Sequence, residues 1–452
     1  MEAPLPNLFL ADMDPPLALT PGTVREACQA IRRNRASWLL RLRTRQVAEI
    51  IAYVAEQWLD PANGFRRRAL SEGAAELGMG PATLARGLDA FLRQLTLENL
   101  EGLVAQDLGD ARRLDDFSAG VAEVRGGRSA VARGPALLAH VASGNIPVPA
   151  LHSMVTGLLL RSAQFVKCAS GRTLLPRMFA HSLAATEPRL GSCLELACWP
   201  RGSEQLDAAL FEEANCLTAT GSDEMLMDVR ARLPLRTRFV GHGHRVSLAY
   251  VSNEVLSTYS VRRVARELAA DVTAWNQLGC LSPHVAYVQE DGAVSPEGLA
   301  VALSEELARR DIYRLRASAA GAASERPRFE TAFRDLPGGV ALWESEEGTA
   351  WTVVLDRDPR FEHSCLNRFV YVKPVGQLDE MLRVLEPVRG QVSTVGLAAV
   401  DHRATDLARE LAAWGVPRVC PVGRMQDPPL AWRHDGRPAL ADLVEWTDLE
   451  NA

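Results

Sequence analysis

The sequence lacks the features that mark exported, membrane-spanning and nucleic-acid-binding proteins. Its N-terminal segment, MEAPLPNLFLADMDPPLALT, contains no basic stretch followed by an apolar run, and nowhere do about 18 apolar residues follow one another. The formal net charge is only −6, and no block of like charges occurs. We therefore expect a cytoplasmic protein with no membrane span and no nucleic-acid partner.

Cysteine is sparse, and no two cysteines form a CxxC pair with the spacing of a metal site. Scattered cysteines in a long chain are typical of reduced thiols, of which one at most has a special chemical role. The eight are Cys28, Cys168, Cys193, Cys198, Cys216, Cys280, Cys365 and Cys420.

The first part of the chain has a helical pattern, and a short glycine-rich segment follows it. In residues 1–114, apolar residues such as Val47, Ile51 and Val54 recur at helical spacing. Residues 115–133 contain AGVAEVRGGRSAVARG, whose alternation predicts a β-hairpin turning near Gly126-Gly127. The exposed edges of such an arm favour assembly into a homodimer or a larger oligomer.

Beyond this arm, short apolar strands alternate with helices, which predicts an α/β fold with parallel, doubly wound sheets. We expect two such domains, at 134–247 and 248–428, with a boundary near 245–255, and a C-terminal tail at 429–452. The predicted strands are ALLAHVA, FVKCA, LELAC, CLTAT, VAYVQ, VALWE, TAWTVVL, RFVYVKPV, TVGLAAV and RVCPVG.

Two turns after predicted strands carry polar residues with possible binding roles. In HVASGNIPVPALHSMVTGLLLRSAQFVKCAS, a strand–helix–strand unit without GxGxxG, Asn145 either donates its amide to an oxyanion or caps the helix. Lys167 either reaches a cofactor ribose or phosphate or is a solvated strand end. In CLTATGSDEML, Gly221 and Ser222 either present free N–H groups to a phosphate or form an ordinary helix cap.

The segment TAWNQLGCLSPHVAYVQ places Cys280 on a polar turn between an amphipathic helix and a strand. A cysteine on a glycine-preceded turn is accessible, whereas one on a helix or strand face is usually packed as a small hydrophobe. Cys280 is therefore the candidate nucleophile, with inert burial as the alternative. His284 in the same turn is either its general acid/base or a cap of the turn.

RFVGHGHRVS carries His242 and His244 on a glycine-rich connection. Two histidines at this spacing can hold a metal, but no third ligand is evident in the sequence, and solvated histidines are common in such turns. We therefore predict no metal site.

Taken in order, these segments resemble the aldehyde dehydrogenase superfamily, and more closely its branch of LuxC-type fatty acyl-CoA reductases, over about residues 115–450. The resemblance rests on GNIP, VKCAS, TGSDE, WNQLGCLSPH and the segment TVGLAAVDHRATDLARELAAWGVPRVCPVGRM. It implies an aldehyde dehydrogenase-like fold in which residues 1–114 belong to the cofactor domain, 134–247 bind NADP, 248–428 carry the nucleophile, and the tail joins the oligomerisation arm.

The resemblance also implies roles for particular residues. Cys280 is the nucleophile, Asn145 the oxyanion donor and Lys167 the contact to the adenosine ribose, while Gly221 and Ser222 lie over the pyrophosphate. Members that prefer NAD commonly have a Glu three residues after the strand Lys. Here that position is Ser170, with Arg172 close by, which predicts NADPH because a small neutral residue and a nearby Arg accommodate the 2′-phosphate. The alternative is that Ser170 merely turns the chain and Arg172 points into solvent.

Two departures from the superfamily pattern concern Glu residues. Aldehyde-oxidising members carry a Glu base where this sequence has the glycine- and histidine-rich segment 241–245, and the Glu expected near 366–369 is also missing. Without the first Glu, an acyl-enzyme is not directed toward hydrolysis. The expected activity is thus NADPH-dependent reduction of an acyl thioester, from acyl-CoA or acyl-carrier protein, to the aldehyde. A cofactor-independent acyltransferase or thioesterase using Cys280 is the alternative, and an inactive scaffold is a third.

Overall fold

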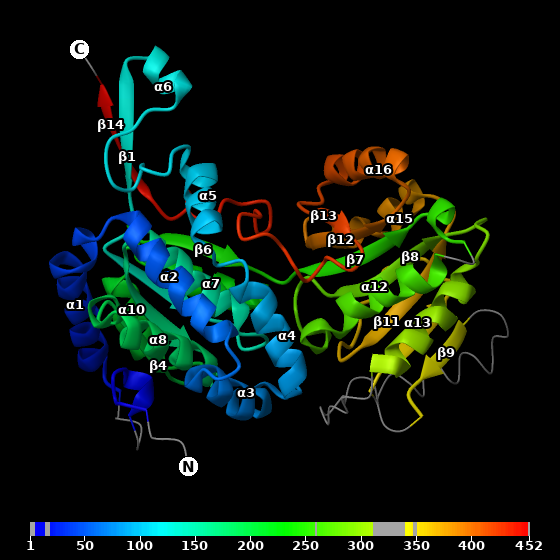
Figure 1. Cartoon of the computed structure of the whole chain (residues 1–452), viewed down its shortest axis with the longest axis horizontal. Coiled ribbons are helices and arrows are strands. Elements are labelled where there is room, and N and C mark those ends of the chain that lie inside the picture. Colours follow the sequence, from blue (N-terminus) through cyan, green and yellow to red (C-terminus); the bar gives the residue numbers. More distant parts are fainter. Residues whose placement is uncertain (1–4, 14–18, 258–259, 311–339, 347–349, 451–452) are drawn as a thin grey trace.

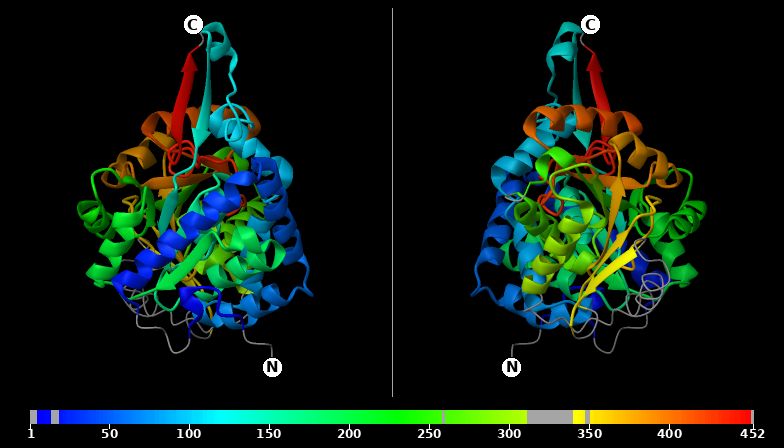
Figure 2. Two further views of the ribbon diagram at one scale, coloured as in Figure 1. Left: turned by 90° about the vertical axis from the view of Figure 1, so that its left-hand side faces the viewer. Right: turned by 90° about the vertical axis from the view of Figure 1, so that its right-hand side faces the viewer.

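The computed structural model describes residues 5–13, 19–257, 260–310, 340–346 and 350–450. Two lobes, each built on its own sheet, lie side by side, and a narrow arm projects from the first (Figure 1). Figure 2 shows the same arm extending beyond both lobes, with the C-terminal end of the chain at its tip. The predicted α/β fold is confirmed, with two mainly parallel sheets and a small antiparallel one.

The first lobe contains a fully parallel sheet with the strand order β4-β3-β2-β5-β6. Its helices pack on both faces, so its strands are buried and nearly continuously apolar. The strands are β2 (Leu137–Val141), β3 (Ala163–Cys168), β4 (Leu194–Cys198), β5 (Cys216–Thr220) and β6 (Arg238–His242). The helices between them are α7 (Val148–Leu159), α8 (Leu174–Thr186), α9 (Pro188–Gly191), α10 (Glu204–Glu213) and α11 (Asp223–Arg232).

The N-terminal helices complete this lobe. The apolar residues of the first helix join the core beneath α10, and those of the other four pack with α7 and α8 on the opposite face. The five are α1 (Pro21–Ser37), α2 (Thr44–Leu59), α3 (Gly64–Leu77), α4 (Pro81–Leu92) and α5 (Leu97–Leu108).

The second lobe contains a seven-stranded sheet with the order β13-β12-β7-β8-β11-β10-β9, in which only β9 runs antiparallel. Its strands are β7 (Val246–Val251), β8 (Pro283–Gln289), β9 (Val340–Glu344), β10 (Thr352–Asp356), β11 (Phe369–Val375), β12 (Val392–Ala398) and β13 (Val419–Pro421). Its helices are α12 (Val261–Thr273), α13 (Pro296–Arg310), α15 (Leu378–Val384) and α16 (Asp401–Trp414).

The strand order of the first sheet reverses between β2 and β5, which are neighbours although β3 and β4 lie between them in sequence. Ligands of open parallel sheets bind outside the carboxyl ends of the strands at such a point. The chain leaves β2 toward Asn145 and leaves β5 through Gly221 and Ser222, so the predicted residues of both turns lie at this edge.

The arm differs from the predicted hairpin. Residues Val121–Arg125 form a short helix, α6, in which the Glu123 carboxylate accepts the Gly120 N–H at 2.7 Å. Strand β1 (Arg128–Arg133) pairs antiparallel with β14 (Glu445–Glu450), the last strand of the tail. The hairpin prediction was wrong over Val121–Arg125, because Val121 and Val124 stand three residues apart, which is helical spacing, and Glu123 caps the start of the helix.

Strands β6, β7 and β14 were also not predicted. β7 begins at Val246 and is already part of the second sheet, so the chain crosses between the lobes at 243–245. The first residue of the predicted strand at 349–355 lies outside the described residues. Within the described part of the chain, every helix is too short or too polar to span a bilayer.

Candidate active site

A cavity lies where the two lobes and the tail meet. The empty space there, including the part open to solvent, is about 1330 Å³, and Cys280 is in its wall. Most of the lining is apolar and comes from α4, α7, the Cys280 turn and the tail. Its larger apolar side chains are those of Phe91, Ile146, Val148, Trp275, Leu281, Leu430, Trp432 and Leu443.

The turn that carries Cys280 is held by unusual backbone geometry. Trp275, Asn276 and Gln277 all have φ between 51° and 63°, the left-handed region that non-glycine residues seldom adopt. A second left-handed run at 366–368 faces it, and the Asn276 Nδ2 donates to the Asn367 Oδ1 at 2.9 Å. Such strain persists only where the surroundings over-determine it, and it is often found at functional sites.

Further hydrogen bonds position the same turn. The buried Gln277 amide donates to the carbonyls of Pro283 and Phe369, each at 2.9 Å, and the Ser247 hydroxyl donates to the Cys280 carbonyl at 2.7 Å. The Trp275 ring packs directly on Gly87 of α4, where a side chain would lie 2.3 Å from the ring. Both lobes therefore brace the turn.

Cys280 is half-buried in the cavity rather than on an exposed turn. Burial, and then the negative charge of Asp435, raise the pKa of its thiol to about 12, against the opposing effect of Arg245 and Arg418. The thiol is neutral at ordinary pH, so it requires a base to become a nucleophile.

Asn145 lies beside this turn, but its side chain is exposed. The GNIP turn contacts the Cys280 turn through Ile146, the residue after Asn145. An added Cβ on Gly279 would lie 3.6 Å from the Ile146 Cδ1. The structure thus brings the GNIP turn against the nucleophile turn and leaves the Asn145 amide outside the cavity lining.

The predicted cofactor residues after β3 lie at one edge of the first sheet. Lys167 donates to Asp207 at 2.7 Å and lies over the Trp199 ring, so one of its three donors is already used. Ser170 is exposed. Arg172 packs over Gly144, where an added Cβ would lie 3.0 Å from the Arg172 Cγ. The buried Nη1 of Arg172 has no hydrogen-bond partner among the described residues.

Gly221 and Ser222 lie at the start of α11. The Ser222 side chain caps this helix by accepting the Met225 N–H at 3.3 Å, which is the helix cap that the sequence allowed as the alternative to a phosphate site. Asp223 and Glu224 occupy its first turn, and the Asp223 carboxylate accepts the His244 N–H at 3.0 Å. A helix cap does not exclude a phosphate contact, because the backbone N–H groups of the first turn remain directed outward.

His284 does not line the Cys280 cavity. Its Nδ1 accepts the Ser364 N–H at 3.0 Å, and its ring lies near those of Phe361 and His363. Burial, followed by the charges of His363 and His244, lowers the pKa of His284 to about 4. The arrangement fits a structural residue better than the predicted general acid/base.

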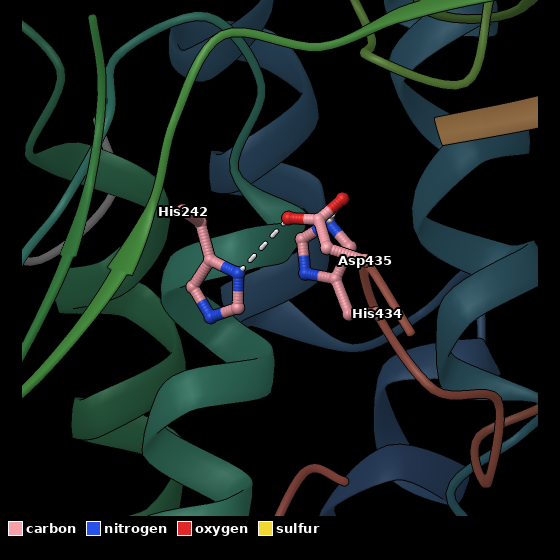
Figure 3. A group of neighbouring side chains, drawn as sticks. All are labelled: His242, His434 and Asp435. Atoms are coloured by element: carbon pink, nitrogen blue, oxygen red, sulfur yellow. Dashed lines mark hydrogen bonds and ion pairs between the residues drawn. The ribbon is translucent and has the colours of Figure 1, made fainter. Parts of the chain in front are cut away.

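The structure also gathers a group that the sequence did not reveal. His242 of β6 lies against His434 and Asp435 of the tail, far apart in sequence (Figure 3). The His242 Nδ1–H donates to the Asp435 carboxylate at 3.3 Å, and the rings of His242 and His434 stack at 4.6 Å. His244, the other histidine of the same glycine-rich segment, lies near His363.

The carboxylate at the centre of this group is buried and ionised. Its side chain is 4% exposed, and Arg245 forms an ion pair with it at 3.2 Å. Burial alone would raise its pKa, but the hydrogen bond from His242 and the neighbouring charges hold the pKa of Asp435 at about 2. Asp435 stands in a tail loop without apolar periodicity, so no sequence pattern indicates its role.

Comparisons with known proteins identify the family of this chain. The model of the family described as acyl-CoA reductase (LuxC) matches residues 39–446. Two curated relatives, each named long-chain acyl-protein thioester reductase, come from Aliivibrio fischeri and Photorhabdus laumondii, and they are 21% and 20% identical to this chain. Each match covers 91% of this chain and 83% of the relative.

Solved structures share the fold. The NADP-dependent glyceraldehyde-3-phosphate dehydrogenase of Bacillus halodurans C-125 has a TM-score of 0.72 at 14% identity, over 96% of this chain and 92% of that one. A putative aldehyde dehydrogenase from Anabaena variabilis has a TM-score of 0.70 at 16% identity, over 96% and 95%. Proline Utilization A of Bradyrhizobium japonicum has a TM-score of 0.68, but the chain spans only 45% of it. The fold is that of the aldehyde dehydrogenase superfamily, and the chain belongs to the acyl-CoA reductase (LuxC) family.

Proposed function

We propose that this chain reduces an acyl thioester, carried on CoA or on a carrier protein, to the aldehyde through an acyl-enzyme on Cys280, with NADPH as the reductant. The observation that carries the proposal is the position of Cys280 in the wall of a mainly apolar cavity, beside the GNIP turn. An apolar cavity of this kind suits an aliphatic acyl chain, as in the relatives named for long-chain substrates.

In the proposed reaction, the Cys280 sulfur forms a bond to the acyl carbon and the bond to the leaving sulfur breaks, which releases a thiol. The Asn145 amide and the Cys280 backbone N–H stabilise the tetrahedral oxyanion. Asn145 reaches the oxyanion by turning inward from its exposed position. Absence of a Glu at 241–245 leaves the acyl-enzyme without the water-activating carboxylate of aldehyde-oxidising members.

The residues at the edge of the first sheet fit a phosphorylated dinucleotide. Arg172 has a buried, unpartnered Nη1, and Ser170 is small and exposed, so the two suit a 2′-phosphate. Lys167 would hold the adenosine ribose with one of the ammonium N–H groups that Asp207 does not use, and the start of α11 would contact the pyrophosphate. When bound there, NADPH supplies the hydride that reduces the acyl group.

The cofactor-independent alternative also has an observation in its favour. Cys280 and His242 line one cavity, and His242 is hydrogen-bonded to Asp435 behind it; a cysteine, a histidine and an aspartate also serve acyltransferases and thioesterases. Both functions include acylation of Cys280, so only hydride transfer separates them.

The test is the oxidation of NADPH in the presence of a long-chain acyl-CoA, with the aldehyde trapped as a hydrazone. The proposal predicts one NADPH consumed and one thiol released for each aldehyde formed. Thiol release with fatty acid as the only product and no loss of NADPH would refute the reductase and favour the alternative.

A further inference from the structure

The proposed function leaves one chemical requirement unmet. Burial in the cavity keeps the Cys280 thiol neutral, so its attack on a thioester requires a base. His284, the predicted base, does not line the cavity, and the Glu of aldehyde-oxidising relatives is missing at 241–245. Four histidines line the same cavity as Cys280, namely His140, His152, His242 and His434.

Of these histidines, His242 has the arrangement of a base. Its Nδ1 is engaged with Asp435, and its second ring nitrogen, Nε2, lies on the side of the ring turned away from that carboxylate (Figure 3). A carboxylate on Nδ1 selects the tautomer whose Nε2 accepts a proton, and it stabilises the imidazolium that results. Both ring nitrogens of His140 are engaged by Thr218 and Gln164, and neither His152 nor His434 has a hydrogen-bonded carboxylate of this kind among the described residues.

We propose that His242 and Asp435 form a proton-transfer dyad for the acylation of Cys280, an inference that rests on the acyl-transfer half of the proposed function. Nε2 of His242 takes the proton from the Cys280 thiol while the sulfur forms its bond to the acyl carbon. The bond to the leaving sulfur then breaks, and Nε2 returns the proton to that sulfur. A thiol and a thioester thus become an acyl-enzyme and a new thiol, with no net oxidation.

The same three residues do not have the geometry of a metal centre. The His242 and His434 rings are stacked with an interplanar angle of 11°, so their in-plane lone pairs run side by side instead of converging on one ion. Asp435 is already paired with the Arg245 cation, which repels a metal ion. The geometry therefore favours proton transfer over coordination.

The first experiment measures acylation alone, by rapid quench and mass spectrometry, with a long-chain acyl-CoA and no NADPH. For His242→Asn we expect a rate about 10²–10⁴-fold below wild type, the usual contribution of a general base. His244→Asn is the matched control, because this exposed residue lies two positions away and outside the cavity. Its acylation rate should equal that of the wild type.

The Asp435→Asn variant distinguishes a proton-transfer dyad from a purely electrostatic effect of Asp435 on the Cys280 thiol, because the two predict opposite changes in the acylation rate. The Asp435 charge raises the pKa of Cys280, so its removal makes the thiolate easier to form and should speed alkylation of Cys280 by iodoacetamide at high pH. Acylation by the thioester at neutral pH should nevertheless slow, because the His242 imidazolium loses its partner. Faster acylation in Asp435→Asn would overturn the dyad.

The pH profile gives a second readout. Acylation in wild type should be fast well below the pKa of the Cys280 thiol, because His242 removes the proton. His242 faces Asp435 and His434 of the tail, Arg245 of its own segment, His152 of α7 and Arg437 of the tail. In His242→Asn the rate should instead climb with hydroxide up to the pKa of the thiol. An unaltered profile would overturn the proposal, as would loss of wild-type acylation on adding a metal chelator.

Further variants distinguish three outcomes: unfolding of the variant, refutation of the proposed function, and refutation of the dyad alone. His242→Gln serves as a second variant, and both variants must retain the near-ultraviolet circular dichroism of the wild type. If Cys280→Ser still acquires the acyl group, the proposed function fails. If only Cys280 is acylated and both His242 variants acylate as fast as wild type, the proposed function stands and the dyad is refuted.

Discussion

Cys280 differs from the other cysteines in its surroundings more than in its acidity. Burial raises the pKa of Cys420 to about 11, close to the value of about 12 for Cys280, yet only Cys280 lines the cavity. Cys280→Ser should therefore abolish acyl-enzyme formation, whereas Cys420→Ser should leave it unchanged. Peptide mapping of the acylated wild type checks this, and an acyl group on Cys168 or Cys216, both buried in strands, would contradict it.

Asn145 is expected to act on the transition state. Removing one oxyanion donor typically lowers the rate by about 10²–10³-fold, so Asn145→Ala should lose turnover to that extent with little change in KM. Ser143→Ala in the same turn is the control. An Asn145→Ala enzyme with more than half the wild-type turnover would exclude the oxyanion role.

Ser170 and Arg172 decide the predicted cofactor preference. A Glu at position 170 would repel the 2′-phosphate, so Ser170→Glu should weaken NADPH far more than NADH. Arg172→Ala should have the same effect more mildly, since Arg172 also packs on Gly144. Reduction rates with both cofactors test this, and a wild-type preference for NADH would show that the assignment is wrong.

At the scale of elements, the sequence predicted best where strands are buried on both faces. LELAC and CLTAT coincide with β4 and β5, because a short apolar run bounded by turn residues strongly favours a buried strand. β7 was missed since it follows the glycine-rich segment at 241–245 without a turn of its own. β14 is exposed along its whole length, so no apolar pattern marks it.

The candidate site was predicted in part, for a similar reason. Asn145, Ser170 and Gly221 stand in turns after strands, and Cys280 stands in a turn between a helix and a strand; in such turns the local sequence carries the information. The His242–Asp435 contact joins residues 193 positions apart, and Asp435 adopts φ 53° in a loop. No period or short motif encodes such a pairing, because only the folded tail creates it.

The N-terminal segment at 5–13 is attached to β4 through Glu195, whose carboxylate accepts the N–H groups of Leu10 and Leu196 at 2.8 and 3.0 Å. Burial raises the pKa of Glu195 from 4.5 to about 7. The protonated carboxyl is thus favoured in the fold, and its contribution to stability is fully present below pH 4.5 and is lost as the pH rises through about 7.

Glu195→Gln should remove this pH dependence, because Gln retains the acceptor oxygen and never ionises. We expect the variant to be about 1–2 kcal/mol more stable than wild type at about pH 8 and nearly equal at about pH 4. Urea unfolding at the two pH values measures it, with the exposed Glu204→Gln as control. Parallel stability curves for Glu195→Gln and wild type would refute the assignment.

For the molecule as a whole, the arm is the main candidate for self-association. Val121, Val124 and Trp446 are 74%, 65% and 45% exposed, an unusual grouping of apolar side chains on a projecting element. We expect at least a dimer by light scattering, and a smaller particle for the double variant Val121→Asp/Val124→Asp. Leu235→Asp, at another exposed apolar position, should not change the particle size. A monomeric wild type would contradict the prediction.

The tail has a consequence for biosynthesis. Residues 429–450 follow both lobes in the chain, yet they contribute Leu430 and Leu443 to the cavity wall and Asp435 to the proposed dyad. A ribosome-bound chain can form both sheets before this segment has emerged. At that stage the cavity lacks part of its wall, and the Cys280 thiol lacks the proposed His242–Asp435 dyad. By this reasoning, the proposed acylation of Cys280 starts only after residues 429–450 have packed, and a protein cut near residue 429 that loses this segment is expected to be inactive.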